Sequence, residues 1–252
     1  MNTTVERTLS KVPEVTLVFW MIKIAATTLG ETGGDAVSMS MHMGYLTSTI
    51  IFAAIFLLSV AAQIKAKGFH PFLYWTTIIA TTTVGTTLAD FSDRSLGIGY
   101  AGGTTLLLAL LLASLALWQR TLGTVSVESV STPRAEMFYW MTIMFSQTLG
   151  TALGDWTADT AGLGYEGAAV VFGLLLALVA MAYYRTRISH TLLFWTAFIL
   201  TRPLGAVIGD FLDKPISSGG LALSRFSASA TLLLFIVACL LFFRQRAAQQ
   251  AH

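Results

Sequence analysis

Residues 148–156 read TLGTALGDW and place a carboxylate, Asp155, at the end of an otherwise apolar run. The run covers residues 137–155, and about 20 residues of helix span the hydrocarbon core of a membrane, which is about 30 Å thick. An ionisable group inside such a segment is costly, so its presence calls for a specific reason. The glycines at 150 and 154 on the same helix supply a second constraint, that of close helix packing.

The composition of the whole chain indicates an integral membrane protein. The chain has 252 residues, of which 55% are hydrophobic and 11% charged, and its mean hydropathy is +0.71. Soluble domains average about 25% charged residues. The formal net charge of +2 gives no indication of nucleic-acid binding. The single cysteine, Cys239, excludes an intrachain disulfide, and residues 1–14 lack the apolar core of a signal peptide.

Hydropathy predicts an all-α polytopic protein with eight transmembrane helices. The segments are 15–35, 43–63, 71–90, 99–118, 137–155, 162–184, 191–210 and 220–243. Basic residues lie in both tails and after every second segment: Arg7, Lys11, Lys65, Lys67, Arg120, Arg134, Arg185, Arg187, Arg244 and Arg246. Because positive charge favours the cytoplasmic side, we expect both termini in the cytoplasm and the acidic turns outside.

A four-fold internal repeat is the strongest pattern in the chain. Trp20, Trp75, Trp140 and Trp195 each precede a glycine by ten residues and an aspartate by fifteen. The glycines are Gly30, Gly85, Gly150 and Gly205, and the aspartates are Asp35, Asp90, Asp155 and Asp210. We expect a single membrane domain, 1–252, with repeats at about 11–65, 66–120, 131–187 and 188–246. Each repeat pairs one motif helix with one plain helix, so all four motif helices point the same way.

This pattern of an aromatic residue and Trp followed by Gly-x-x-x-Gly/Ala-Asp, in four copies, resembles a bacterial family of uncharacterised integral membrane proteins. That family is built from a tandem "repeat of unknown function". The resemblance implies an eight-helix protein of the bacterial inner membrane, and it supplies no catalytic residues. Function must therefore be inferred from the residues of this chain.

The small residues of the motif predict close contacts between helices. Gly30 and Gly34, Gly85 and Ala89, Gly150 and Gly154, and Gly205 and Gly209 are pairs spaced four residues apart. Such pairs let helix backbones approach closely in lipid, where no hydrophobic force drives association. Packing alone accounts for the glycines, but it does not account for the aspartates.

Three of the four motif helices carry an oxygen-rich stripe at the positions four, seven and eight residues before the aspartate, whereas repeat 4 has Ala206, Pro203 and Arg202 there. The predicted ion-binding set consists of carboxylates and hydroxyls: Glu31, Asp35, Asp90, Asp155, Asp210, Thr28, Thr86 and Thr151. The five carboxylates of this set are the candidate metal ligands, because hard oxygen ligands suit Mg²⁺, Ca²⁺ or Mn²⁺. Lys23 and Arg202 are the expected charge partners, with Lys23 placed to neutralise Glu31. Asp93, Asp159 and Asp213 form a secondary tier.

Two interpretations of these acids stay open at this stage. The aspartates either line a central site or end their helices by hydrogen bonding to local backbone. We expect a secondary transporter of a small cation, either a divalent metal or a proton-coupled solute, because internal repeats with polar, glycine-containing helices are typical of such carriers. The alternatives are a non-transporting sensor or assembly protein and, third, an intramembrane hydrolase.

The sequence contains no motif that is typical of an enzyme or of a cofactor-binding protein. The chain lacks a Walker loop, a dinucleotide-binding glycine pattern and a zinc-protease helix, so we expect neither an enzyme nor a cofactor. The expected partners are membrane lipid and a small cation or proton, with no nucleic acid. The sequence leaves the oligomeric state open.

Overall fold

The computed structural model describes residues 10–248, so the predicted cytoplasmic residue Arg7 lies outside the described part. The described chain is all-α and contains eight long helices and no strand. The helices are α1 (Leu17–Asp35), α2 (Tyr45–Lys65), α3 (Pro71–Asp90), α4 (Tyr100–Leu122), α5 (Pro133–Asp155), α6 (Gly164–Arg185), α7 (His190–Asp213) and α8 (Arg225–Phe242). Short helical turns are Ala36–Ser40, Phe91–Ser95, Val127–Ser129, Trp156–Thr160 and Ile216–Ser218. The predicted all-α class and the eight helices are therefore confirmed.

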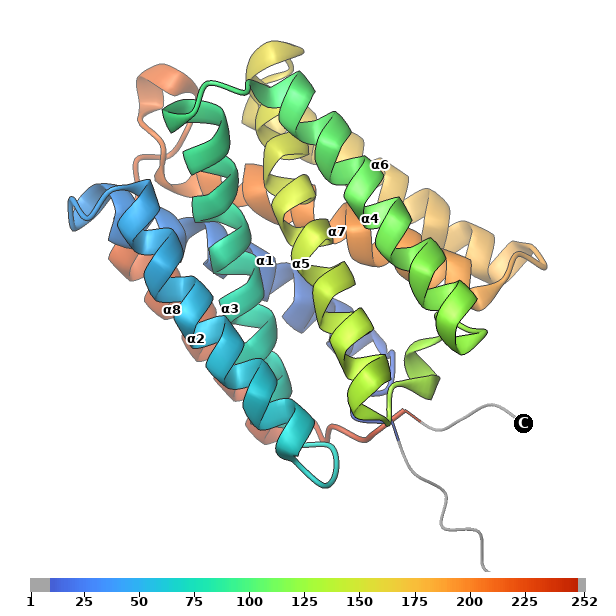
Figure 1. Cartoon of the computed structure of the whole chain (residues 1–252). Helices are drawn as coiled ribbons and strands as arrows, with labels where there is room; N and C mark the ends of the chain where they lie inside the picture. Colours follow the sequence, from blue (N-terminus) through green and yellow to red (C-terminus); the bar gives the residue numbers. More distant parts are fainter. Residues whose placement is uncertain (1–9, 249–252) are drawn as a thin grey trace, which may run out of the picture.

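The four motif helices, α1, α3, α5 and α7, form a closed ring. Each contacts the motif helix of the repeat before it and of the repeat after it, and α7 closes the ring against α1. Figure 1 shows α3 and α5 side by side in front of α1 and α7. Asp35, Asp90 and Asp155 are the last residues of α1, α3 and α5, and Asp210 lies three residues before the end of α7, so all four lie at the same end of the ring, as the predicted common direction of the motif helices requires.

The remaining helices, α2, α4, α6 and α8, cover the ring from outside. Each of these cover helices packs chiefly against the motif helix of the following repeat: α2 against α3, α4 against α5, α6 against α7, and α8 against α1. In Figure 1 α2 and α8 lie at one flank of the ring and α4 and α6 at the other. The last repeat thus supplies the cover for the first, so the four copies close into a circle.

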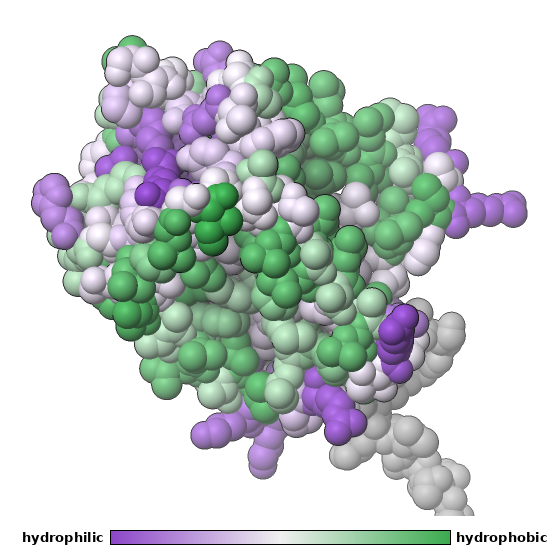
Figure 2. Space-filling model, turned by 45° about the horizontal axis from the view of Figure 1, so that its top comes forward, coloured by the Kyte–Doolittle hydropathy of each residue, from purple (hydrophilic) through white to green (hydrophobic). Residues whose placement is uncertain are grey.

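Five helices, α2, α4, α6, α7 and α8, are long and apolar enough to cross a membrane. Only 11–22% of the apolar stretch of α2, α4, α6 and α8 is buried, whereas 72% of that of α7 is buried. The other motif helices do not reach this apolarity, because threonines, glycines and acids fill the faces that they turn inward. Figure 2 shows hydrophobic side chains over much of the visible surface.

The motif glycines allow the ring to close. A Cβ atom on Gly85 would lie 2.9 Å from the backbone carbon of Gln147 on α5, and one on Gly30 would collide with the side chain of Thr82 on α3. A Cβ on Gly150 would meet the side chain of Arg202, and one on Gly205 that of Thr27. At all four interfaces, therefore, the glycine five residues before one aspartate faces the residue eight before the next. The predicted glycine contacts are confirmed.

The same register places side chains of the four motif helices in layers across the axis of the ring. Positions four residues apart lie about 6 Å apart along a helix. Counted back from the aspartates, the layers are Glu31, Thr86, Thr151 and Ala206; then Thr27, Thr82, Gln147 and Arg202; then Lys23, Ile78, Ile143 and Phe198; and then Phe19, Tyr74, Tyr139 and Phe194. All of these side chains are buried. The axis is thus polar near the aspartates and aromatic at its other end.

We call these two ends the acidic end, defined by the four motif aspartates, and the aromatic end, defined by Phe19, Tyr74, Tyr139 and Phe194. At the aromatic end the hydroxyls of Tyr74 and Tyr139 form a 2.5 Å hydrogen bond, and the rings of Phe19 and Phe194 lie 6.2 Å apart. Aromatic side chains from all four motif helices therefore close the axis at this end.

Glycine substitution tests this packing. Gly85→Ala is expected to lower the thermal midpoint of the detergent-purified protein, because its Cβ meets backbone of α5 that cannot move aside; overpacking of this kind costs about 1–3 kcal/mol. Gly173→Ala on α6 is the matched control, since nothing lies within 4 Å of its Cβ, and alanine there is neutral or mildly stabilising. Equal midpoints for the two variants would contradict the register described above.

Candidate functional site

The four motif aspartates meet at the acidic end of the ring. Asp35, Asp90, Asp155 and Asp210 are each at most 4% exposed. Carboxylate oxygens of Glu31, Asp35 and Asp90 all lie within 4.8 Å of one another, and those of Asp35, Asp210 and Asp213 do so as well. The ring therefore gathers acids from all four repeats, which are far apart in the sequence, into one layer.

Two cations bridge neighbouring aspartates in this layer. Lys214 Nζ lies 2.5 Å from Asp35 Oδ2 and 3.0 Å from Asp210 Oδ1. Arg94 Nε lies 2.8 Å from Asp90 Oδ1, and its Nη2 lies 3.9 Å from Asp155 Oδ2. Each cation thus joins the aspartate four residues before it to the aspartate of the next repeat.

These bridges create a two-fold pattern within the four-fold ring. Lys214 and Arg94 follow the aspartates of repeats 4 and 2, whereas Met39 and Asp159 hold the same position in repeats 1 and 3. Burial lowers the pKa of Lys214, but the carboxylates of Asp210 and Asp35 outweigh burial, and the pKa is raised above its usual value. The ammonium is therefore charged at neutral pH.

A third cation, Arg225 at the start of α8, was not among the predicted partners. Its Nε lies 3.0 Å from Asp213 Oδ2, and its Nη2 lies 3.7 Å from Asp35 Oδ2. The bridges of Arg94 and Lys214 have a signal in the sequence, because a cation four residues after an acid lies on the same helical face. Arg225 has no such signal, since only the packing of α8 against α1 brings it to Asp35.

Arg202 occupies the centre of the ring next to the acidic layer and is fully buried. Its Nη2 donates to Glu31 Oε2 at 3.0 Å, to Thr86 Oγ1 at 2.6 Å and also to Thr151 Oγ1. These three acceptors lie four residues before their aspartates on α1, α3 and α5. One guanidinium nitrogen thus links the motif helix of repeat 4 to those of the other three repeats, and Arg202 is confirmed as a charge partner of Glu31.

Further buried polar atoms along the axis lack partners among residues 10–248. They include Nε and Nη1 of Arg202, the amide nitrogen and oxygen of Gln147 and the hydroxyl of Thr82. Buried polar groups in proteins are normally hydrogen-bonded, and the exceptions often mark sites of function, water or ions. The axis therefore contains polar groups that form no hydrogen bond with the described residues.

The prediction that Lys23 neutralises Glu31 is wrong. Lys23 Nζ has no hydrogen-bond or ion-pair partner in the described part of the chain and lies 4.2 Å from the centre of the Phe198 ring. The physical reason is distance along the helix, because eight residues correspond to about 12 Å. Arg202 reaches Glu31 from across the ring instead.

Other predicted residues stand apart from the central group. The hydroxyl of Thr28 donates to the backbone oxygen of Ile24 on its own helix, at 3.0 Å, and Thr27 takes the place in the axial layer. In the secondary tier only Asp213 joins the acidic group. Asp159 is exposed, and Asp93 lies against Gly103 of α4.

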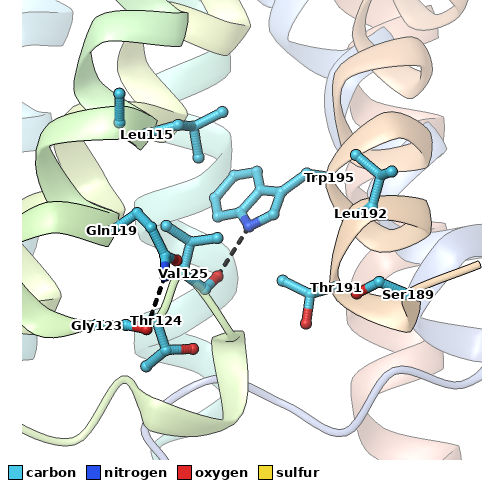
Figure 3. Close-up of a pocket in the computed structure, with 10 residues that line it drawn as sticks. Leu115, Gln119, Gly123, Thr124, Val125, Ser189, Thr191, Leu192 and Trp195 are labelled. Carbon is cyan, nitrogen blue, oxygen red and sulfur yellow. Dashed lines mark hydrogen bonds between the residues drawn. The ribbon is translucent and has the colours of Figure 1, made fainter.

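A separate pocket of about 490 Å³ lies near the aromatic end, between the end of α4 and the start of α7. Ten uncharged residues line it, including Leu115, Gln119, Leu192 and Trp195. Figure 3 shows the indole of Trp195 pointing across this pocket, where its N–H donates to the backbone oxygen of Val125 at 2.9 Å. No charged group faces it, so the acid chemistry of the molecule lies elsewhere.

The fold and the site define an all-α protein of four two-helix repeats, closed into a ring with a polar axis and several helices apolar enough for a membrane. Comparison with known families gives a match to the family described as Repeat of Unknown Function (DUF347), at residues 18–69, 73–124, 138–189 and 193–247. The chain belongs to this family. Each matched copy covers most of one motif helix and the whole of the cover helix that follows it.

No curated protein and no solved structure matches the chain. The family description assigns no activity, so the chemistry of the site has to be argued from its own residues.

The buried pair of Arg202 and Glu31 yields a stability prediction. Arg202→Met leaves the Glu31 carboxylate buried without its cation, and breaking such a pair costs about 3–5 kcal/mol. Adding Glu31→Gln removes the stranded charge, so the double variant is expected to unfold at a higher temperature than Arg202→Met alone. Thermal unfolding in detergent measures both midpoints. Losses that simply add in the double variant would show that the two groups do not interact.

Proposed function

We propose that this protein is a secondary transporter of a small cation in the bacterial inner membrane. The cargo is a divalent metal such as Mn²⁺, Mg²⁺ or Ca²⁺, or a solute coupled to protons. The observation that carries the proposal is the layer of buried carboxylates at one end of a polar axis enclosed by four repeats. Internal repeats that surround buried polar residues are typical of secondary transporters, and intramembrane acids commonly mark their ion pathways.

The charge of the acidic end supports a cation as cargo. Its acids are Glu31, Asp35, Asp90, Asp155, Asp210 and Asp213, and its cations are Arg94, Arg202, Lys214 and Arg225. Six carboxylates against four cations leave two negative charges when all are ionised, which is the charge that one divalent metal would neutralise. Carboxylate and hydroxyl oxygens are the ligands that Mg²⁺, Ca²⁺ and Mn²⁺ prefer.

In this proposal all eight helices cross the membrane. The motif helices are less apolar because the cover helices hold them away from lipid. The aromatic end faces the cytoplasm, because the last turns of α2, α4 and α6 lie there and contain the basic residues Lys65, Arg120 and Arg185. The acidic end then faces the outside, and the aromatic layer closes the route toward the cytoplasm.

This topology can be tested with single cysteines. Lys67→Cys and Thr160→Cys, each in a Cys239→Ala background, introduce exposed thiols at the aromatic and acidic ends respectively. A membrane-impermeant maleimide added to intact cells is expected to label the variant at 160 and to leave the variant at 67 unlabelled until the membrane is opened. Labelling of both from the same side would overturn the proposed orientation.

A flux assay tests transport itself. Purified protein is reconstituted into vesicles that contain a Mn²⁺-sensitive dye and a pH-sensitive dye, and uptake is followed under an imposed pH gradient. We expect Asp155→Asn and Glu31→Gln to abolish uptake, because an amide keeps the size of the carboxylate but loses its charge.

Asp159→Asn is the matched control for Asp155→Asn. Its carboxylate lies four residues further on but is exposed and outside the acidic layer, so uptake should be unchanged. A variant in which all four motif aspartates and Glu31 are neutralised, yet which transports at the wild-type rate, would overturn the proposed site.

A second candidate, a non-transporting sensor or assembly protein, has one observation in its favour. The four motif aspartates and Glu31 each have a Lys or Arg within 4.0 Å, as expected if ion pairs only hold the ring together. Absence of uptake by the stable wild-type protein, together with loss of stability in the Asp→Asn variants, would favour this candidate. The same pairing argues against a hydrolase, which needs two facing carboxylates that share a proton.

A further inference from the structure

The acidic end contains a three-carboxylate group that lies to one side of the ring. Asp35 belongs to α1, and Asp210 and Asp213 are three residues apart at the end of α7. One oxygen from each lies within 4.8 Å of the others, and all three side chains are nearly inaccessible. Rigid helix ends thus fix three anionic ligands from two elements in one place.

In two of these carboxylates only one of the two oxygens contacts a cation of the protein. Asp35 accepts its cations through Oδ2, and Asp213 accepts Arg225 through Oδ2. Asp35 Oδ1 and Asp213 Oδ1 are buried and have no hydrogen-bond partner among the residues that the structure describes. Buried anionic oxygens without partners are costly, so these two atoms point to a ligand that the protein itself does not supply.

The ammonium of Lys214 stands where a bound cation would stand. It contacts Asp35 at 2.5 Å and Asp210 at 3.0 Å. Its side chain is 12% exposed, in contrast to the carboxylates that it contacts, and helix α7 ends one residue before it. The ammonium is also a compact point charge on a flexible stem. A different side-chain conformation of Lys214 would release both acids without a change in the helices that hold them.

We propose that Asp35, Asp210 and Asp213 bind a hard divalent cation, and that Lys214 is a tethered competitor that must leave this group before the cation enters. The inference rests on the proposed function, because it assigns the class of cargo and the first binding step at the acidic end. Lys214 and Arg225 offset the charge of these acids between binding events, and the entering metal replaces the single positive charge of Lys214 with two.

The opposite side of the ring supplies a natural comparison. Arg94 bridges Asp90 and Asp155 there as Lys214 bridges Asp210 and Asp35. The guanidinium of Arg94 is planar and contacts each carboxylate through a different nitrogen, whereas the ammonium of Lys214 is a point charge that contacts both carboxylates through one atom. Asp93, which corresponds to Asp213, lies against Gly103 instead of joining the bridged pair. On the Lys214 side, by contrast, Asp213 joins the bridged pair of Asp35 and Asp210.

Titration of the full-length, detergent-purified protein with Mn²⁺, followed by electron paramagnetic resonance of the free ion, tests the proposal. Lys214→Met is expected to tighten Mn²⁺ binding by about tenfold or more, because a positive charge at contact distance is removed. Lys214→Arg should not tighten it. Excess Mg²⁺ should displace the bound Mn²⁺ if the site selects hard divalent cations.

Two further variants control for general electrostatic effects. Arg94→Met removes the same charge from the bridge between Asp90 and Asp155, which Asp93 does not join, and should tighten binding much less. Asp213→Asn added to Lys214→Met should reverse the gain. Should Lys214→Met fail to fold, Lys214→Gln takes its place, and Asp213→Asn alone is expected to weaken Mn²⁺ binding.

Equal affinities of the wild type and Lys214→Met, or a gain that survives Asp213→Asn, would overturn the inference. The titration requires no flux, so its outcome is separable from that of the transport assay. Binding that follows these expectations in a protein without uptake would contradict the proposed function alone. Uptake by a protein in which Lys214→Met has no effect on affinity would contradict only the role given to Lys214.

Discussion

The contact between a glycine of one motif helix and a polar side chain of the next is the constraint on which the rest of the structure depends. Gly30 faces Thr82, and Gly205 faces Thr27, at equivalent points of their interfaces. A Cβ at either glycine would overlap its neighbour, so each helix must present this position in one rotation only. Four such contacts in sequence bring the chain back to α1 and close the ring.

The rotation of each motif helix also decides where its charged side chains lie. The face that holds the glycine contact also turns the polar stripe of each helix toward the axis, where acids from all four repeats meet away from water. Buried acids without counter-charges would repel one another and oppose closure. Arg202 at the centre and Lys214 and Arg94 between neighbouring aspartates supply the counter-charges. The proposed binding site and the stability of the ring therefore depend on the same side chains.

Divergence among the repeats decides where the ring is asymmetric. Backbone packing is four-fold, because the small residues are kept in every copy, whereas the bridging cations follow a two-fold pattern and Arg202 occurs in one repeat only. The cation of the proposed function would need a defined position, whereas four identical copies would offer four equivalent half-sites. Substitution at a few stripe positions gives the axis a distinct α1–α7 side without disturbing helix packing.

The sequence by itself determined the helices, the repeat and the polar face, because each depends on spacing within a single segment. It therefore placed Asp155 and its counterparts on one side, and it identified the glycine contacts correctly. Only the tertiary structure decided that each cover helix packs on the next repeat, that Arg202 rather than Lys23 reaches Glu31, and that Arg225 joins the acidic layer. These features join helices that are distant in the chain, and their geometry depends on how far a side chain reaches across a packed interface, which no local pattern of residues specifies.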